Sequence, residues 1–519
     1  MSNQNRKEEL IDLVAYAQDG YGFYEKQLKE LEAIYFAEMD EETKKFLEDR
    51  EKSSLFFNKS QAKCNTSSFS LLKNYFSNDK FASVEADNED ETYVSIARAI
   101  EKESKAQLKN IKYFSALLPG LYKLPYVGTI ITRTYWAGKI VVEDIGLDDF
   151  YFDRDAKSQD DVRYCVHDVY VAIEDIKRMQ RDGIYDRSFN IDELISDADA
   201  KAYTRVKLQE IYTKVGEEWK VSTIYDNTHF FRLDVVLNDG LPFNWGGLSP
   251  QLKRLDEDNY IANYYQPFIS VLKPLQIEYN MRRNQIIDGL KQQLSPKLLV
   301  PKNTGINPLD LSKPSGCIPV AIPTSIQIVP AANVSGAMAD VQMISQEMNE
   351  ISSMPDILNG VSMQKNKTAK QVGIEASSGG VKLDIDTRTL NETFFEPQLK
   401  RVCLLSWKYA ESDNFMGVDR TVDPKLKITF NTGLGVTNDV VKTELLDSSF
   451  MKMQQLLDNQ LALRDPDASK TLNGMKELLR ESLTVSGIKD ADEYLGEKKE
   501  LGEVSQLNQP PMPQEIGEQ

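Results

Sequence analysis

Residues 281–303 read MRRNQIIDGLKQQLSPKLLVPKN, and this stretch holds the transition that decides the fold. Its first half continues a helical pattern that begins at about Pro267 and, by residue 294, would span roughly 40 Å. Residues 295–332 then contain seven prolines. Proline lacks a backbone donor and blocks the preceding helical turn. The stretch therefore predicts a long helix that leads into a small β-rich insertion.

The middle of this helix is polar. Arg282, Arg283 and Asn284 interrupt its apolar positions, with Asn280 before them and Gln285 after them. The core helix of a monomer rarely carries such a centre, whereas a helix between identical subunits of a ring can. We therefore take Arg282, Arg283 and Asn284 as candidate functional residues.

A second helix is predicted after the insertion, at about 336–354, because Met and branched residues recur there every three or four positions. The polar loop 356–368 follows. Lys365 and Lys367, with Lys370 just beyond the loop, form a compact basic group. Such a group makes weak, sequence-blind phosphate contacts or simply belongs to a solvated loop, and its position alone does not separate the two.

The regions on either side mix helices and strands, so the predicted fold class is α+β. A charged helical arm that faces solvent or a partner is expected over 6–57, and another helix over 93–118 that stops at Pro119-Gly120. Strands and one short helix follow, at 129–135, 139–145, 163–171, 173–182 (the helix), 206–214, 218–226 and 230–237. After about residue 369 the pattern predicts a helix, a strand at 425–430, helices at 438–463 and 468–486, and a disordered tail from Gly502.

Composition excludes several classes of protein. The 519 residues carry a formal net charge of −18, which disfavours a broad nucleic-acid grip. The four cysteines (Cys64, Cys165, Cys317 and Cys403) form no Cys-x-x-Cys pair, so free thiols are expected and a zinc site is not. No apolar run is long enough for a signal peptide or a transmembrane helix.

Signs of catalysis are weak. The two histidines, His167 and His229, fall inside predicted strands, where a structural role is expected, and no phosphate-binding loop occurs. The acidic clusters at 148–155 and 256–258 have the chemistry to bind a divalent cation, but clustering by chance is the simpler explanation in a chain with 80 acids. We predict no catalytic residue, metal or cofactor.

The order of elements resembles that of portal proteins of tailed bacteriophages, in which a helical stem is interrupted by a clip. The strings that carry the resemblance are KIVVEDIGLDDFYFDRDAKSQDDVRYCVHDVYV (139–171), MRRNQIIDGLKQQLSPKLLVPKN (281–303), EISSMPDILNGVS (350–362), TLNETFFEPQLKRV (389–402) and KITFNTGLG (427–435). The resemblance covers about residues 130–495 and is closest to the portals of short-tailed phages.

This resemblance implies a domain order. It comprises a helical arm and start of the wing (1–125), wing (126–263), stem helix (264–294), clip (295–332), second stem helix (333–355), tunnel loop (356–368), long wing helix and closing strand (369–435), helical crown (436–501) and disordered tail (502–519).

The resemblance also implies a function: a ring at one capsid vertex, a dodecamer, through which double-stranded DNA is packaged and ejected. Lys365, Lys367 and Lys370 would touch DNA without sequence preference. The implied partners are the terminase large subunit, the major capsid protein or a scaffold, and tail adaptors, with no membrane. The chain would belong to the virion, be assembled in the host cytoplasm, and not be an enzyme. Two alternatives stay open: another head–tail adaptor or large scaffold protein, and a metal-dependent nuclease.

Overall fold

The computed structural model describes residues 3–76, 82–87, 90–189, 191, 203–251, 261–294, 298–299, 327–328, 335–354, 382–430, 448–456, 471–472, 474–476 and 478–479. The chain divides into two compact units, Met1–Leu434 and Gly435–Gln519, and each is described by itself. The fold mixes helices and strands, as the sequence predicts.

Two antiparallel sheets form the body of the first unit. The larger sheet has the order β4-β5-β6-β7-β8, with bounds Phe150–Phe152, Tyr164–Ala172, Arg205–Val215, Glu218–Tyr225 and His229–Leu237. The smaller sheet has the order β3-β2-β9, with bounds Ile140–Ile145, Thr129–Trp136 and Phe243–Gly247. The strands expected from β-branched and aromatic runs are confirmed, as is the short helix α6 (Ile173–Arg181).

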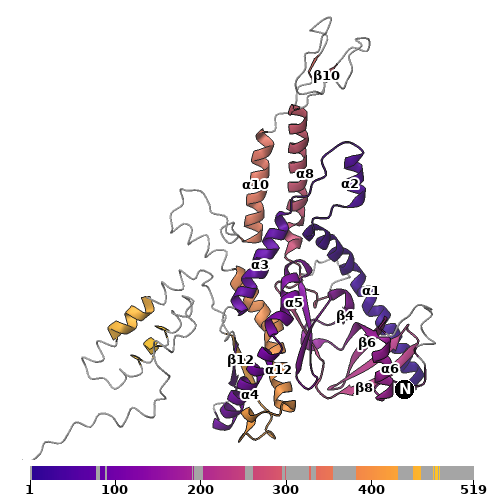
Figure 1. Cartoon of the computed structure of the whole chain (residues 1–519), viewed down its shortest axis with the longest axis vertical. Coiled ribbons are helices and arrows are strands. Elements are labelled where there is room, and N and C mark those ends of the chain that lie inside the picture. Colours follow the sequence, from indigo (N-terminus) through magenta and orange to yellow (C-terminus); the bar gives the residue numbers. More distant parts are fainter. Residues whose placement is uncertain are drawn as a thin grey trace, which may run out of the picture. The chain divides into compact units, whose positions relative to one another are not determined.

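The structure corrects the prediction of a helical arm over 6–57 that faces solvent or a partner. Helix α1 (Asn3–Tyr35) belongs to the body instead. It packs lengthwise against the body, and its apolar residues join the core formed by the two sheets (Figure 1): Leu10, Val14, Ala17, Tyr21, Tyr24 and Leu28. These positions recur every three or four residues, so they form one buried stripe beneath a charged outer face. The helix also ends earlier than predicted. A short helix α2 (Glu41–Glu48) follows, and the chain is non-helical from 52 to 58.

The predicted helix end at Pro119-Gly120 is wrong. Helix α4 (Glu91–Asn110) is followed by α5 (Tyr113–Val127), which continues through Pro119 and Pro125. Leu117, Leu121 and Leu124 of α5 are fully buried. Burying each leucine contributes about 1.5–3 kcal/mol, so the three together are of the same order as the penalty of about 3 kcal/mol for each of the two prolines. Tertiary packing therefore overrides the local breaker.

A strand near the end of this unit pairs with a strand in its N-terminal part. Strand β12 (Leu426–Phe430) pairs antiparallel with β1 (Ala82–Ala86), with Ile428 opposite Val84. Helical residues 382–390, a π-helical turn (Asn391–Phe395) and α12 (Glu396–Tyr409) pack between the smaller sheet and α3 (Lys59–Phe76), α4 and α5. The expected apolar helix and closing strand are confirmed over these residues.

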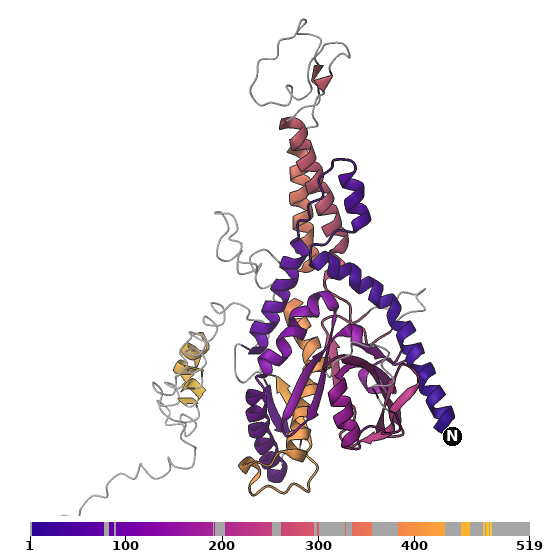
Figure 2. The same cartoon turned by 45° about the vertical axis from the view of Figure 1, so that its right-hand side comes forward.

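Helices α8 (Ile269–Leu294) and α10 (Ser335–Ser352) form a long pair that extends away from the sheets (Figure 1 and Figure 2). Leu290 and Ala337 meet in one cluster and Leu272 and Met348 in another, so the two helices run antiparallel. We call them the helical hairpin. Next to its outer end, β10 (Leu298–Leu299) pairs antiparallel with β11 (Gln327–Ile328).

Four short described segments lie in the second unit. Residues 448–456 are helical, inside the helix predicted at 438–463, and short helical pieces lie between 471 and 479. The predicted loop 356–368, Lys370, Cys317, most of the insertion 295–332, the acids 256–258 and the tail from 502 lie outside the described residues.

Candidate functional site

The polar side chains of α8 hold an extended segment of the same chain. We call residues 53–60 the strap, which comprises the extended residues 53–58 and the first two residues of α3. Side-chain oxygens of α8 accept hydrogen bonds from strap backbone N–H groups in four pairs: Asp288 with Ser53 (2.9 Å), Asn284 with Leu55 (3.0 Å), Asn280 with Phe57 (2.9 Å), and Gln276 with Lys59 and Ser60 (2.9 and 2.8 Å). Two amides also donate back, Asn284 to the carbonyl of Leu55 and Gln276 to that of Phe57, at 2.8 and 2.7 Å.

The spacing explains why this ladder is regular. Four residues of helix rise about 6 Å. Two residues of extended chain rise about 6.6 Å. Side chains on every fourth helical position therefore meet every second strap residue, and the two segments run antiparallel. The ladder binds mainly backbone atoms, and the hydroxyls of Ser53 and Ser60 at its two ends also donate to Asp288 (2.6 Å) and Gln276 (3.0 Å).

This ladder changes the interpretation of the polar helix centre. Asn284 is buried by the strap of its own chain, so its polarity alone does not indicate a neighbouring subunit. The Arg283 guanidinium lies over the ring of Phe57, 4.8 Å from its centroid. Arg282 is 38% exposed, and its Nε lies 3.8 Å from the nearest oxygen of Glu278. The signal that sequence reasoning missed is the four-residue period of Gln276, Asn280, Asn284 and Asp288.

The base of the hairpin is anchored in the body. One apolar cluster joins α8 and α10 to α1, α3 and α5. Tyr35 stacks on Tyr126 with ring centroids 4.2 Å apart, and the buried Lys63 ammonium donates to the carbonyl oxygen of Met354 at 2.6 Å. These contacts couple the position of the hairpin to the body, so a displacement of one is resisted by the packing of the other.

A buried ionic cluster joins the two sheets. Glu210 on β6 accepts from Arg232 at 2.5 Å and from the Tyr212 hydroxyl at 2.7 Å, and Arg133 on β2 lies 3.4 Å away. Burial alone would raise the pKa of Glu210, but Arg133, His167 and Arg232 hold it well below its usual value. The carboxylate therefore stays charged at neutral pH, which suits a structural ion and not a proton donor.

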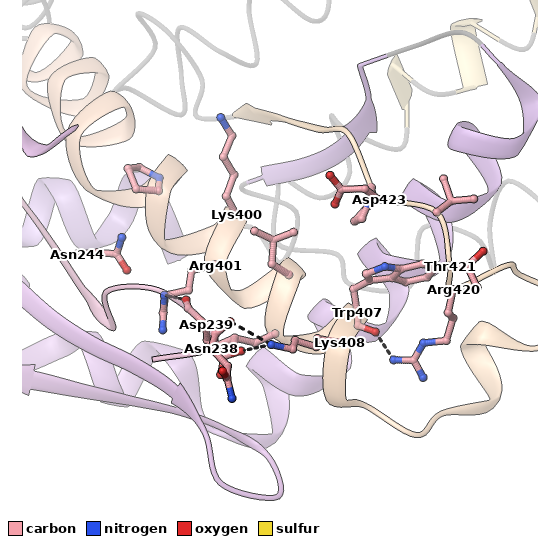
Figure 3. A pocket seen from close by; sticks show the side chains of 15 residues that line it. Asn238, Asp239, Asn244, Lys400, Arg401, Trp407, Lys408, Arg420, Thr421 and Asp423 are labelled. Atoms are coloured by element: carbon pink, nitrogen blue, oxygen red, sulfur yellow. Dashed lines mark hydrogen bonds and ion pairs between the residues drawn. The ribbon is translucent and has the colours of Figure 1, made fainter. Parts of the chain in front are cut away.

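A cavity of about 820 Å³ lies beside α12 (Figure 3). Its walls come from α12, the connection from β8 to β9, and residues 420–424. Arg401 donates to the carbonyl oxygens of Thr134 (2.6 Å) and Asp239 (2.9 Å), and burial lowers the pKa of Arg401 to about 10. Lys408 pairs with the Asp239 carboxylate at 2.6 Å.

The cations of this cavity are mostly engaged by the chain itself. Arg420 donates to the carbonyl oxygen of Trp407 (Figure 3) and to that of Ala410. Arg401 and Lys408 tie α12 to the connection that holds Asn238 and Asp239. The side chains of the cavity therefore position neighbouring segments of the chain.

The histidines, the described cysteines and the first acidic cluster lie within strands, in the core or in a loop that they shape. His167 is buried in β5 with its Nδ1 3.8 Å from Glu210, and His229 begins β8. Cys64, Cys165 and Cys403 are buried free thiols. Asp153 accepts from the backbone N–H groups of Asp155 and Arg163, both at 3.0 Å, and so shapes the loop of the first acidic cluster.

Within the described residues, no three His, Cys, Asp or Glu side chains gather in an arrangement that would hold a metal ion. Among the helices in those ranges, none combines the length and apolarity needed to cross a membrane. Lys365, Lys367 and Lys370 lie outside the described residues, so their role stays a prediction.

No family model matches the sequence, and no curated protein matches it significantly.

Proposed function

We propose that this chain is a portal protein of a tailed bacteriophage, a structural subunit that forms a ring around a DNA channel at one capsid vertex. The subunit count proposed is twelve. In this role the chain is not an enzyme and needs no cofactor. It belongs to the virion and is assembled in the host cytoplasm.

The observation that carries the proposal is the path of the chain through the hairpin. An α+β body continues into α8, and the chain leaves at Leu294 for an excursion of about forty residues. The two ends of the excursion are paired, with Leu298 opposite Ile328, before α10 returns to the body. A wing, a stem, a clip and a second stem helix follow one another in this order in portal proteins, which the sequence resembles.

The charge of the chain is compatible with a sliding channel. A net charge of −18 limits counterion release, so DNA would pass without being held. The proposed DNA contacts are Lys365, Lys367 and Lys370. In this proposal the excursion meets the terminase large subunit during packaging and tail adaptors afterwards, and the body contacts the major capsid protein or scaffold.

The test is assembly followed by packaging. Purified chain should form closed rings with a central channel in particle images, with a mass that is an integer multiple of 59.0 kDa. Capsid precursors built with the chain should take up DNA when terminase and ATP are added. Rings that support no packaging in any such system, or a chain that stays monomeric at high concentration, would overturn the proposal.

A further inference from the structure

The cavity beside α12 carries positive charge in an otherwise acidic chain. Its volume of about 820 Å³ lies within the range of about 300–1,000 Å³ that small-molecule sites occupy. Four cationic side chains and two anionic ones line it: Lys400, Arg401, Lys408 and Arg420, with Asp239 and Asp423. The excess of two positive charges contrasts with the net charge of −18 of the whole chain. The cavity therefore favours an anion.

The charge of Arg401 is not balanced by a neighbouring carboxylate. Its Nε and Nη1 donate to carbonyl oxygens, and within the described part of the chain its Nη2 donates to no group and its guanidinium forms no ion pair. The Asp239 carboxylate pairs instead with Lys408 and accepts from the Tyr409 hydroxyl. Burial lowers the pKa of Arg401 to about 10, so the guanidinium stays charged at neutral pH. A largely buried cation with neutral acceptors gains a charge-assisted bond when an anion enters.

Asn244 of β9 places a second unsatisfied group on the same side of the cavity as Arg401 (Figure 3). Asn244 lies opposite Thr132 of β2, so both side chains project from one face of the smaller sheet. The Thr132 hydroxyl accepts from Gln398 at 3.0 Å, so this is the face that α12 covers. Asn244 is 7% exposed, yet its amide makes no hydrogen bond to any described residue. A buried amide without a partner is uncommon, and it can bond to a molecule that enters the cavity.

Much of the remaining wall is apolar. Pro397, Leu404 and Leu405 of α12 line it, together with Val422 and Pro424 of the segment 420–424. Leu404 is 47% exposed, so nearly half of this apolar side chain is open to contact. A bare inorganic ion would leave such a wall uncovered, whereas the apolar body of an organic molecule would remove it from water. The wall therefore favours an organic anion over an inorganic one.

We propose that this cavity binds a small organic anion, a molecule with a carboxylate or phosphate group and an apolar body. The Nη2 of Arg401 and the amide of Asn244 hold the anionic group, and the apolar body covers Leu404. Carboxylates and phosphates share the oxygen acceptors that these two donors require. The proposal concerns binding alone, and it does not depend on the proposed portal function.

Binding at this cavity joins three segments of the body that are distant in sequence. Its walls come from the connection between β8 and β9, from α12 and from residues 420–424. Arg401 already links the first two segments, and Arg420 links the third to the residue that follows α12. A ligand that contacts these walls binds the folded chain and not the unfolded one, so the midpoint of thermal unfolding should rise with its concentration.

Four simple probes test the site by calorimetry on the full chain at constant ionic strength. Phenyl phosphate and phenylacetate carry the two anionic groups on an apolar ring, inorganic phosphate lacks the ring, and phenol lacks the charge. At least one organic anion should bind about tenfold or more tightly than inorganic phosphate and phenol, because ring burial adds to the charge-assisted bonds. The stronger of the two identifies the preferred anionic group. Equal binding of inorganic phosphate would indicate a merely basic surface, and it would overturn the proposal, as would no binding of either organic anion.

A matched pair of variants locates the bound anion. Leu404→Glu places a carboxylate beside the ligand, and Leu404→Gln places a neutral group of nearly the same size there. The Glu variant should bind the organic anion about tenfold or more weakly than the Gln variant, because like charges repel at close range. Position 404 is exposed, so both variants should fold, which circular dichroism checks. Met416→Glu, with a side chain that is 76% exposed outside the cavity, controls for the added charge and should bind like the parent.

Asn244→Ala separates a binding role from a structural one. Removing an amide that has no partner should weaken binding of the organic anion about tenfold without lowering the unfolding midpoint of the ligand-free chain. A lowered midpoint with parent-like binding would show that Asn244 serves only the fold, and it would overturn its role as a ligand. Equal binding by the two variants at position 404 would show that the anion binds elsewhere and would overturn the site itself.

Discussion

Asn284 and Leu55, 229 positions apart in the chain, are joined by a reciprocal pair of hydrogen bonds. The Asn284 amide oxygen accepts from the Leu55 N–H at 3.0 Å, and its amide nitrogen donates to the Leu55 carbonyl oxygen at 2.8 Å. A β-strand partner would offer the same pattern, but here one side chain provides it. This pair places the strap on α8 in a single register.

Replacing Asn284 should loosen the strap. Asn284→Ala leaves the N–H and carbonyl of Leu55 without partners in a partly buried place, so we expect a loss of about 2–4 kcal/mol in the free energy of unfolding. Asn284→Asp keeps the acceptor and should cost less. Urea denaturation measures the change, and hydrogen exchange at the Leu55 amide reports the bond directly. Gln285→Ala, at the exposed neighbour, is the control, and an equal loss there would contradict the ladder.

Two glycines in helices should respond with opposite sign to alanine. A Cβ on Gly120 would lie 2.5 Å from an Asp144 oxygen and 2.8 Å from Ile130, so Gly120→Ala should destabilise by about 1–3 kcal/mol. A Cβ on Gly22 in α1 meets nothing within 4 Å. Gly22→Ala should therefore stabilise by about 0.5–1 kcal/mol through the unfolded chain and helix propensity. Thermal unfolding of both variants checks the contrast, and a shift of the same sign in both would refute it.

Glu210 makes the free energy of unfolding of the body depend on pH. Because its folded pKa is lowered, its contribution is complete above the unfolded value of about 4.5 and is lost progressively as the pH falls below that value. Glu210→Gln leaves Arg133 buried without its carboxylate, so we expect a loss of about 3–5 kcal/mol at pH 7. The difference from the parent should shrink below pH 4. Denaturation curves at pH 7 and pH 3.5 measure both effects, with exposed Glu218→Gln as control. A pH-independent difference would count against the cluster.

The excursion between α8 and α10 should be removable. Leu299 pairs with Gln327 across an antiparallel ladder, so a two-residue Asn-Gly turn can replace residues 300–326 without separating the two strands. We expect this deletion to leave the unfolding of the body and ring formation unchanged and to abolish terminase binding. Pull-down of terminase by parent and deleted rings is the measurement. Undiminished binding would refute the assignment of the excursion as the clip.

The three lysines outside the described residues can be tested together. Replacing Lys365, Lys367 and Lys370 by alanine should leave assembly and stability unchanged, because each exposed pairing contributes about 1 kcal/mol or less. DNA retention by packaged particles should fall, and its dependence on salt should weaken. Lys44→Ala with Lys45→Ala, on exposed α2, is the matched control. Normal retention across a range of salt, or a loss of rings, would show that these lysines do not contact DNA.

Local patterns in the sequence were sufficient for most elements of the first unit. The strands of both sheets follow runs of β-branched and aromatic residues, and α8 ends at Leu294 where the prolines begin. The expectation of free thiols likewise followed from the wide spacing of the cysteines, and that of a disordered tail from its composition. The physical reason is that these features arise from interactions between residues a few positions apart, and such interactions are visible in the sequence pattern.

The tertiary structure decided what neighbouring residues could not. Pro119 stays inside α5 because Leu117 and Leu121 are buried on distant elements, and α1 belongs to the core because two sheets cover its apolar stripe. The polarity of Asn284 predicted a contact with a neighbouring subunit. Its hydrogen bonds instead go to Leu55 of the strap, more than two hundred residues earlier in the same chain. The energy of such a contact depends on which distant segment the fold places against the helix. The local sequence pattern of the helix does not identify that segment.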